Sequence, residues 1–152
     1  MKHLLSTFTV LFILLTSSVS WGGVDGKGLY CSLKWSKHKY LKNDETLGFN
    51  FVNGSVGELG IRFSKDKYII VTFPYQIYKT TEKRIDWTFN TYYRLNRETL
   101  RLDYGGRFGD SKGSSIYECE VYPNSFKLNK RLNNELVRLQ KIYDEKRKGN
   151  KI

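Results

Sequence analysis

The 152-residue chain contains only two cysteines, two prolines, one methionine and two histidines. The two cysteines lack the Cys-x-x-Cys spacing of redox-active pairs, and the usual zinc ligand sets cannot be assembled from so few cysteines and histidines. Beyond the first twenty residues, no apolar run is long enough to span a bilayer. We therefore expect no metal, no cofactor and, after signal cleavage, no transmembrane span.

The N-terminal segment has the pattern of an export signal. A basic start at Lys2 precedes an apolar run from Leu4 to Leu15, which ends in the small residues Ser18-Val19-Ser20. We predict that residues 1–20 are a signal peptide and that the mature chain begins at Trp21. Residues 21–152 are then long enough for a single domain, which we place in the periplasm or outside the cell.

Residues 28–122 carry the chemistry of strands and turns. Tyr, Phe, Ile, Val and Thr dominate this stretch, and Gly, Asn and Asp interrupt it at short intervals, including the turn signal Asn53-Gly54. The alternation predicts a mainly β fold, an antiparallel meander that forms a small barrel or a strongly bent sheet of about seven to nine strands. Trp87 is a candidate core residue, and the run from Tyr68 to Phe73 predicts a strand that is covered on both faces.

A helical period follows Pro123, with Asn124 and Ser125 as candidate caps. One apolar stripe contains Leu128, Leu132, Leu136, Leu139 and Tyr143. This stripe predicts one amphipathic C-terminal helix over about residues 126–146, packed on the sheet and followed by a basic tail.

The cysteines lie on the first and the last predicted strand. By the alternation rule Cys31 shares a face with Leu29, Leu33 and Trp35, and Cys119 shares a face with Tyr117 and Val121. Both side chains then point inward. We predict a disulfide between Cys31 and Cys119 that joins the two ends of the meander, because an oxidising compartment favours it.

Positive charge is concentrated at the C-terminus of a chain whose net charge is +11. This charge suggests contact with anionic envelope components through the predicted helix, at Lys127, Lys130, Arg131, Arg138 and Lys141. The alternative is an ordinary solvated helix face. A small ligand in a cavity beside Trp35, Trp87 and Phe89 is a second binding mode, whereas we do not expect a nucleic-acid partner and we expect a monomer.

Catalytic chemistry has weak support in the sequence. His38 has three lysines nearby, which disfavour an imidazolium, and the Gly/Ser-rich loop from Gly105 to Ser115 lacks the ending and the strand–loop–helix context of a phosphate loop. We expect a non-catalytic protein. The alternative is a small hydrolase that uses two carboxylates, drawn from Asp44, Glu45, Glu58, Asp86, Asp103, Asp110, Glu118 and Glu120.

Four segments together resemble a set of small exported proteins of unknown function from marine bacteria and their phages. These segments are Tyr30-Cys31, Ile85-Asp86-Trp87, Leu95-Asn96-Arg97-Glu98-Thr99-Leu100-Arg101-Leu102 and Tyr117-Glu118-Cys119-Glu120-Val121. The resemblance implies a compact β domain and no activity.

Overall fold

The structure of the chain is a computed structural model that describes residues 23–37, 45–105 and 115–149. The predicted signal peptide, His38 and most of the predicted loop between Gly105 and Ser115 lie outside the described residues. Within the described residues, no helix has both the length and the apolar character needed to cross a membrane.

Nine strands precede one helix along the described chain. The strands are β1 (Gly28–Ser36), β2 (Thr46–Val52), β3 (Ser55–Ser64), β4 (Lys67–Thr72), β5 (Gln76–Thr80), β6 (Arg84–Thr88), β7 (Tyr92–Asn96), β8 (Arg101–Tyr104) and β9 (Ser115–Tyr122), and the helix is α2 (Ser125–Gly149). All the strand pairs are antiparallel. Asn53 and Gly54, which connect β2 to β3, have φ angles of 49° and 73°, as a tight two-residue hairpin requires.

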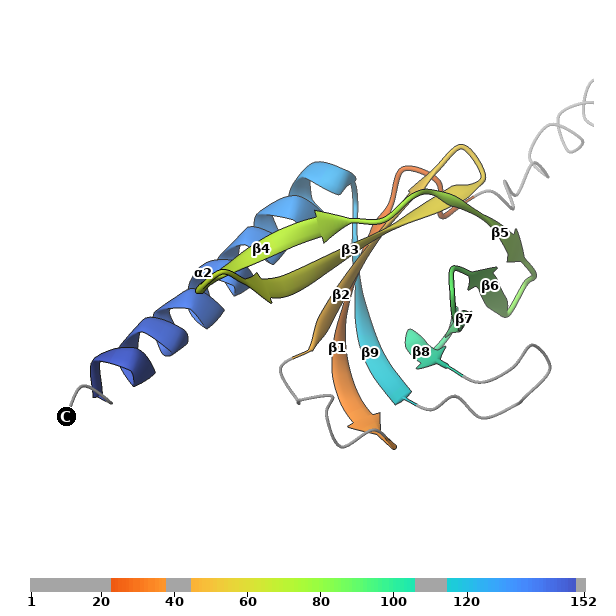
Figure 1. Cartoon of the computed structure of the whole chain (residues 1–152). Coiled ribbons are helices and arrows are strands. Elements are labelled where there is room, and N and C mark those ends of the chain that lie inside the picture. The colour runs from red at the N-terminus through yellow and green to blue at the C-terminus, as the bar shows by residue number, and fades with distance from the viewer. Residues whose placement is uncertain (1–22, 38–44, 106–114, 150–152) are drawn as a thin grey trace, which may run out of the picture.

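The sheet closes into a barrel (Figure 1). Strands pair in the order β2-β1-β9-β8-β7-β6-β5-β3, and a further pairing between β2 and β3 joins the two ends. β4 pairs with β3 and lies outside this closed ring. The predicted mainly β barrel with a C-terminal helix is therefore confirmed, with β4 as an additional strand.

Alternate side chains of the barrel strands point inward and form the main core. Aromatic rings fill its centre, where Phe49 lies edge-on to Trp87 and Tyr93 with ring centroids 5.0 and 5.5 Å apart. Trp87 is buried, so its predicted core position is confirmed. An eight-stranded barrel is just wide enough to be filled by side chains or to hold one small ligand.

The disulfide joins the first and the last strand of the barrel. Cys31 of β1 lies directly opposite Cys119 of β9, with the two Cα atoms 4.0 Å apart. The bond links the first and the last barrel strand of the chain where they pair within the ring, so the predicted pairing is confirmed.

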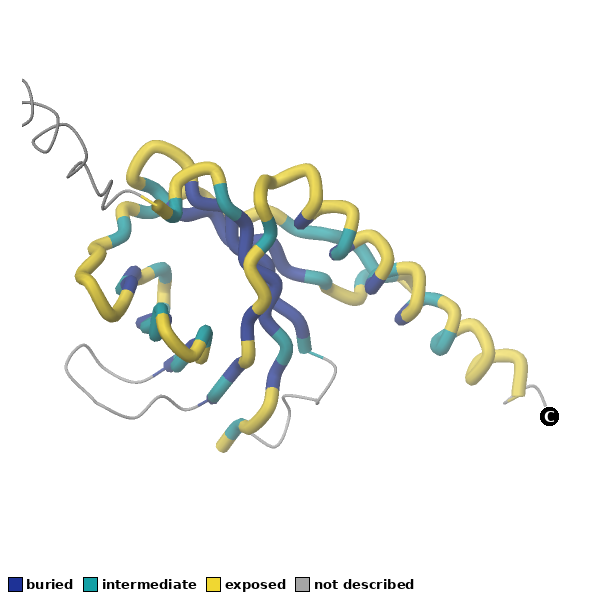
Figure 2. Tube along the Cα trace, turned by 180° about the vertical axis from the view of Figure 1, so that it is seen from behind, coloured by how far each residue is buried: buried dark blue, intermediate teal, exposed yellow. Residues whose placement is uncertain are grey.

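The helix α2 packs on the outside of the barrel and forms a second core with it. Leu128 and Leu132 are fully buried there against Tyr30 and Leu59, and Figure 2 shows the buried positions of α2 on the side that faces the barrel. The backbone N–H of Lys127 donates to the Asn124 side chain at 2.9 Å, which caps the first turn. The helix begins and ends close to the predicted bounds.

Glycines on the outer face of the barrel allow this close packing. A Cβ atom at Gly28 would lie 2.8 Å from Cβ of Leu128, and one at Gly48 would lie 2.8 Å from Cδ1 of Leu132. Both distances are shorter than side chains tolerate. The absence of side chains at these two positions therefore sets how near α2 lies to β1 and β2.

Two predictions about burial are wrong. The pairing of β1 with β9 shifts register between Leu33 and Trp35, which breaks the alternation, and Trp35 is 47% exposed. Trp35 therefore does not belong to the buried core that contains Trp87. The strand from Lys67 to Thr72 is only partly buried rather than covered on both faces, because β4 is an edge strand outside the barrel.

Candidate functional site

The five basic residues predicted as a contact surface lie on one side of α2. At 3.6 residues per turn their side chains fall within about 100° of the helix circumference. Lys127, Lys130, Arg138 and Lys141 are exposed, and Arg131 is partly buried. We call these five residues the outer basic face, and Figure 2 shows that this side of the helix is exposed.

A buried acid positions two members of the outer basic face. Glu135 is 6% exposed, and its carboxylate accepts hydrogen bonds from Arg138 at 2.6 and 3.0 Å and lies 3.6 Å from Arg131. The Arg131 guanidinium also lies over the ring of Tyr30, 4.1 Å from its centroid. These contacts hold both guanidinium groups in place and partly neutralise them.

The lysines of the outer basic face are less constrained. Lys127 and Lys130 form no ion pair with any residue in the described ranges. Lys141 lies 3.9 Å from Glu145, and both side chains are well exposed. Exposed pairs of this kind contribute little stability and leave the lysine available to an anion.

A second polar cluster lies inside the barrel. The Tyr93 hydroxyl donates to Oε2 of Glu58 at 2.7 Å, and both residues are buried. Burial raises the pKa of the Glu58 carboxyl, and the hydrogen bond from Tyr93 acts in the opposite direction. The sequence offers Glu58 only as one of several candidate acids, although its two-residue spacing from Val56, which is buried, indicates an inward position.

Two further polar atoms in the barrel lack partners. The Tyr117 hydroxyl and the Trp87 indole nitrogen are buried and make no hydrogen bond with the described residues. Burial raises the pKa of Tyr117 above that of an ordinary tyrosine. Together with Tyr93 and Glu58, these groups form a polar core that could hold ordered water or a small hydrogen-bonding molecule.

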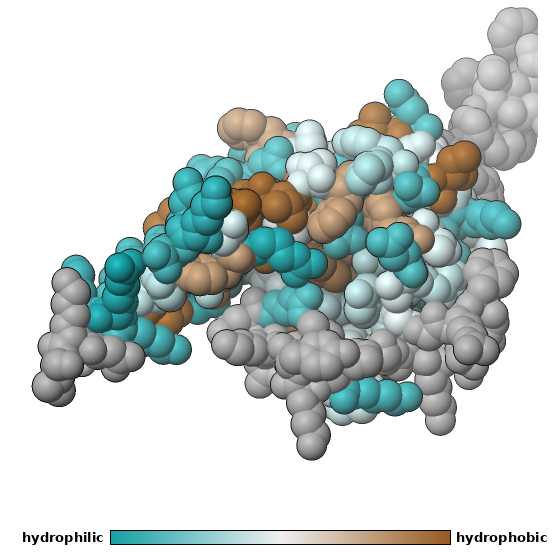
Figure 3. Space-filling model, in the orientation of Figure 1, coloured by the Kyte–Doolittle hydropathy of each residue, from teal (hydrophilic) through white to brown (hydrophobic). Residues whose placement is uncertain are grey.

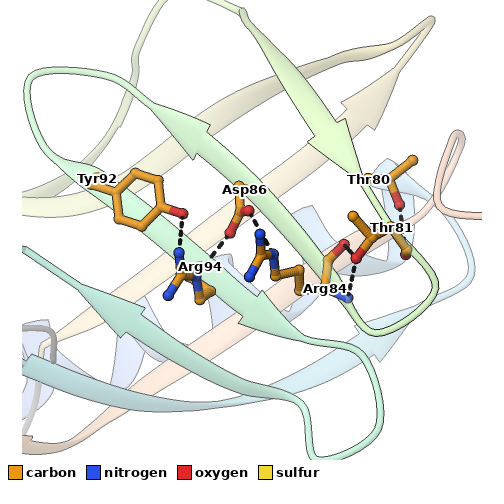
Figure 4. A network of polar contacts seen from close by, with 6 residues as sticks. All are labelled: Thr80, Thr81, Arg84, Asp86, Tyr92 and Arg94. Atoms are coloured by element: carbon orange, nitrogen blue, oxygen red, sulfur yellow. Dashed lines mark hydrogen bonds and ion pairs between the residues drawn. The ribbon is translucent and has the colours of Figure 1, made fainter. Parts of the chain in front are cut away.

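The other carboxylates that the sequence offers for a two-carboxylate hydrolase contact basic or hydroxyl groups at the surface, wherever the structure describes them. On β6, Asp86 lies 3.0 Å from Arg84 and 3.2 Å from Arg94 (Figure 4). The remaining pairs are Glu45 with Arg62, Asp103 with Arg101, Glu118 with Lys34 and Glu120 with Tyr122. Asp44 and Asp110 lie outside the described residues.

Among the residues that the structure describes, no three His, Cys, Asp or Glu side chains come together as a metal site. No family model, no curated protein and no solved structure matches this chain. The features that bear on function are therefore the outer basic face, the barrel interior and the surface between them.

Proposed function

We propose that this chain is a non-catalytic exported protein that binds anionic envelope components through the outer basic face of α2. The observation that supports this function best is that five basic side chains share one side of a helix whose opposite side is buried on the barrel. The disulfide, which is compatible with an oxidising compartment, agrees with the predicted export signal. We place the protein in the periplasm or outside the cell.

The charge of the helix suits an extended anionic partner. α2 contains eight lysines and arginines against three acidic residues, and Lys146, Arg147 and Lys148 occupy its last turn. Attraction between exposed charges is long-ranged and is screened by salt, so binding should weaken steeply as ionic strength rises.

Two exposed apolar residues on α2 favour lipid headgroups among the possible anionic partners. Phe126 is 72% exposed and Val137 is 64% exposed, and helical geometry places both beside the outer basic face. Basic residues flanked by apolar side chains are typical of helices that lie in a membrane interface. We therefore choose anionic vesicles as the first test.

The contacts of the carboxylates favour this function over the alternative of a two-carboxylate hydrolase. Glu58 and Glu45 interact electrostatically, yet Glu58 is held by Tyr93 and Glu45 by Arg62. A hydrolase would need two such groups to face one substrate site.

The test compares two charge-reversed variants of equal net charge. Lys130→Glu/Lys141→Glu changes the outer basic face, and Lys79→Glu/Lys83→Glu changes two exposed lysines on the barrel, on β5 and between β5 and β6. Binding to phosphatidylglycerol-containing vesicles is measured by co-sedimentation. Since each basic residue near an anionic bilayer contributes about 1 kcal/mol, the first variant should bind at least about ten-fold more weakly than the parent.

The barrel variant should retain most of the binding. An equal loss in the two variants would mean that net charge alone causes attraction, and the assignment to α2 would be wrong. Absence of binding by the parent protein at low salt would overturn the proposed function for lipid headgroups, and the same pair of variants would then be tested against an anionic cell-wall polymer.

A further inference from the structure

β4 pairs with Leu59–Ser64 of β3. Gly60 is the last residue of β3 that pairs with β2, and beyond it β3 and β4 form a two-stranded arm that leaves the barrel and lies along α2 (Figure 1). Polar contacts attach the tip of this arm to the helix. Asp66 accepts a 2.9 Å hydrogen bond from the Tyr143 hydroxyl, and the backbone N–H of Tyr68 donates to the Gln140 side chain at 2.8 Å. The arm and the C-terminal half of the helix are therefore held in a defined relative position.

A groove with a volume of about 540 Å³ lies between the arm, the C-terminal half of α2 and the start of β2. Six of its lining residues are aliphatic or aromatic, namely Ile61, Phe63, Tyr68, Leu139, Ile142 and Tyr143. Figure 3 shows hydrophobic side chains between α2 and the arm. The volume is within the range of small-molecule sites.

The aromatic rings in the apolar wall of the groove contact one another, yet the wall remains partly exposed to solvent. The Phe63 ring lies 5.1 Å from the ring of Tyr68 and 4.7 Å from that of Tyr143, measured between centroids. Despite these contacts, Phe63 remains 48% exposed. The groove thus presents an aromatic surface that an apolar chain could cover.

Positive charge predominates among the charged residues of the groove. Its polar lining contains Arg62 and Lys146 against the single acid Glu45, which lies 3.5 Å from Arg62. Lys146 forms no ion pair with any residue in the described part of the chain. A ligand with a negatively charged end would therefore find an available ammonium group beside an apolar wall.

We propose that this groove binds a free single-chain amphiphile that carries a carboxylate, such as a fatty acid. The apolar chain would lie against Phe63, Ile142 and Tyr143, and the carboxylate would contact Lys146. From Leu139 to Lys146 the helix extends about 10 Å, which suits a chain of medium length. The groove lies between the helix and the barrel, so it fits a single molecule taken from solution rather than a flat bilayer.

This inference goes beyond the proposed function, because the groove and the outer basic face occupy different sides of α2. Leu139, Ile142, Tyr143 and Lys146 line the groove, whereas Lys130 and Lys141 point away from it by helical geometry. Either site can therefore fail its test while the other passes.

Binding is tested by isothermal titration calorimetry of the purified protein at neutral pH, with dodecanoate kept below its micelle concentration. Dodecyltrimethylammonium has the same chain and the opposite charge, and dodecanol has no charge. We expect saturable binding of dodecanoate and at least about ten-fold weaker binding of dodecyltrimethylammonium. Equal binding of the three compounds would overturn the carboxylate assignment, and no binding of dodecanoate would overturn the site.

Matched variants locate the ligand. Lys146→Glu should weaken dodecanoate binding by about five-fold, whereas Lys148→Glu, with the same charge change on the same helix, should leave it within about two-fold. Phe63→Ala should also weaken it by about five-fold, and Phe126→Ala, at another exposed phenylalanine, should not. Equal effects within either pair would contradict the proposed position.

A measurement on the unaltered protein keeps the proposal testable if a variant does not fold. Two-dimensional NMR of the parent protein should show dodecanoate-induced shifts concentrated at the amides of Phe63, Tyr68 and Ile142. Shifts confined to the barrel interior or to the outer basic face would overturn the groove site. Loss of vesicle binding by Lys130→Glu/Lys141→Glu with unchanged dodecanoate binding would support two separate sites.

Discussion

The Tyr93 hydroxyl donates a 2.7 Å hydrogen bond to Glu58 inside the barrel, where the two residues are 4% and 6% exposed. Burial raises the pKa of the Glu58 carboxyl above its ordinary value, and it also raises the pKa of the Tyr93 phenol. Ionised Glu58 is therefore costly in the folded protein. This pair links the stability of the barrel to pH.

Glu58→Gln should stabilise the protein at neutral pH. The substitution retains an oxygen that accepts from Tyr93 and removes the buried charge. Folding raises the pKa of Glu58, so protonation of its carboxyl favours the folded state. This contribution to stability is fully present below the ordinary pKa of 4.5 and is lost as the pH rises through the folded-state pKa. We expect a gain of about 1 kcal/mol at neutral pH that disappears in acid.

Urea denaturation of the parent and Glu58→Gln at several pH values measures this effect. The difference in unfolding free energy between variant and parent should increase with pH. A difference that is constant across the range would show that Glu58 titrates alike in the folded and unfolded states.

Tyr93→Phe should destabilise the barrel by about 1–3 kcal/mol, because it leaves the Glu58 carboxylate buried without its donor. Tyr117→Phe is the matched control, since the Tyr117 hydroxyl has no hydrogen-bond partner among the described residues. Thermal unfolding should show a clear loss for the first variant and little change for the second. Equal losses would mean that removal of a buried hydroxyl in general, rather than loss of the bond to Glu58, causes the effect.

The parts of the fold that depend on local periods could be predicted from the sequence. Alternation in the first and last strands placed Cys31 and Cys119 on inward faces, and the structure pairs them. The leucine stripe predicted the buried side of α2, where Leu128 and Leu132 are fully buried. These patterns are informative because side chains return to the same face at every second residue of a strand and at every third or fourth residue of a helix.

Other features depend on contacts that no local period contains. A register shift in β1 exposes Trp35, although simple alternation places it inside. The apolar run in β4 has the composition of a buried strand, but β4 lies in the arm at the edge of the sheet. The burial of Glu135 and its contacts with Arg131 and Arg138 depend on how α2 lies on the barrel, so the sequence alone could not show which basic residues are partly neutralised.

Loss of the disulfide should remove a large share of the stability of the protein. Cys31 and Cys119 are separated by 88 positions, and the chain-entropy model for a loop of this size gives about 4–5 kcal/mol. We expect Cys31→Ala/Cys119→Ala to unfold at a much lower urea concentration than the parent. Treatment with a reductant should affect the parent and leave the double variant unchanged, and a loss below about 1 kcal/mol would show that the strand pairing closes the barrel without the bond.

Gly28→Ala should loosen the packing of α2 on the barrel. The new Cβ would lie 2.8 Å from Cβ of Leu128, an atom close to the helix backbone that cannot move away by rotation of its side chain. The helix must therefore shift, at a cost of about 1–3 kcal/mol. Gly57→Ala is the matched control, because the three heavy atoms nearest to its Cβ would all belong to the far end of the Tyr75 ring, in a side chain that is 52% exposed. Urea denaturation should show a clear loss for Gly28→Ala and a much smaller change for Gly57→Ala, and hydrogen exchange should be faster in α2 of the first variant alone. Similar behaviour of the two variants would mean that the loss arises from strand glycines in general and that contact between β1 and Leu128 does not position the helix.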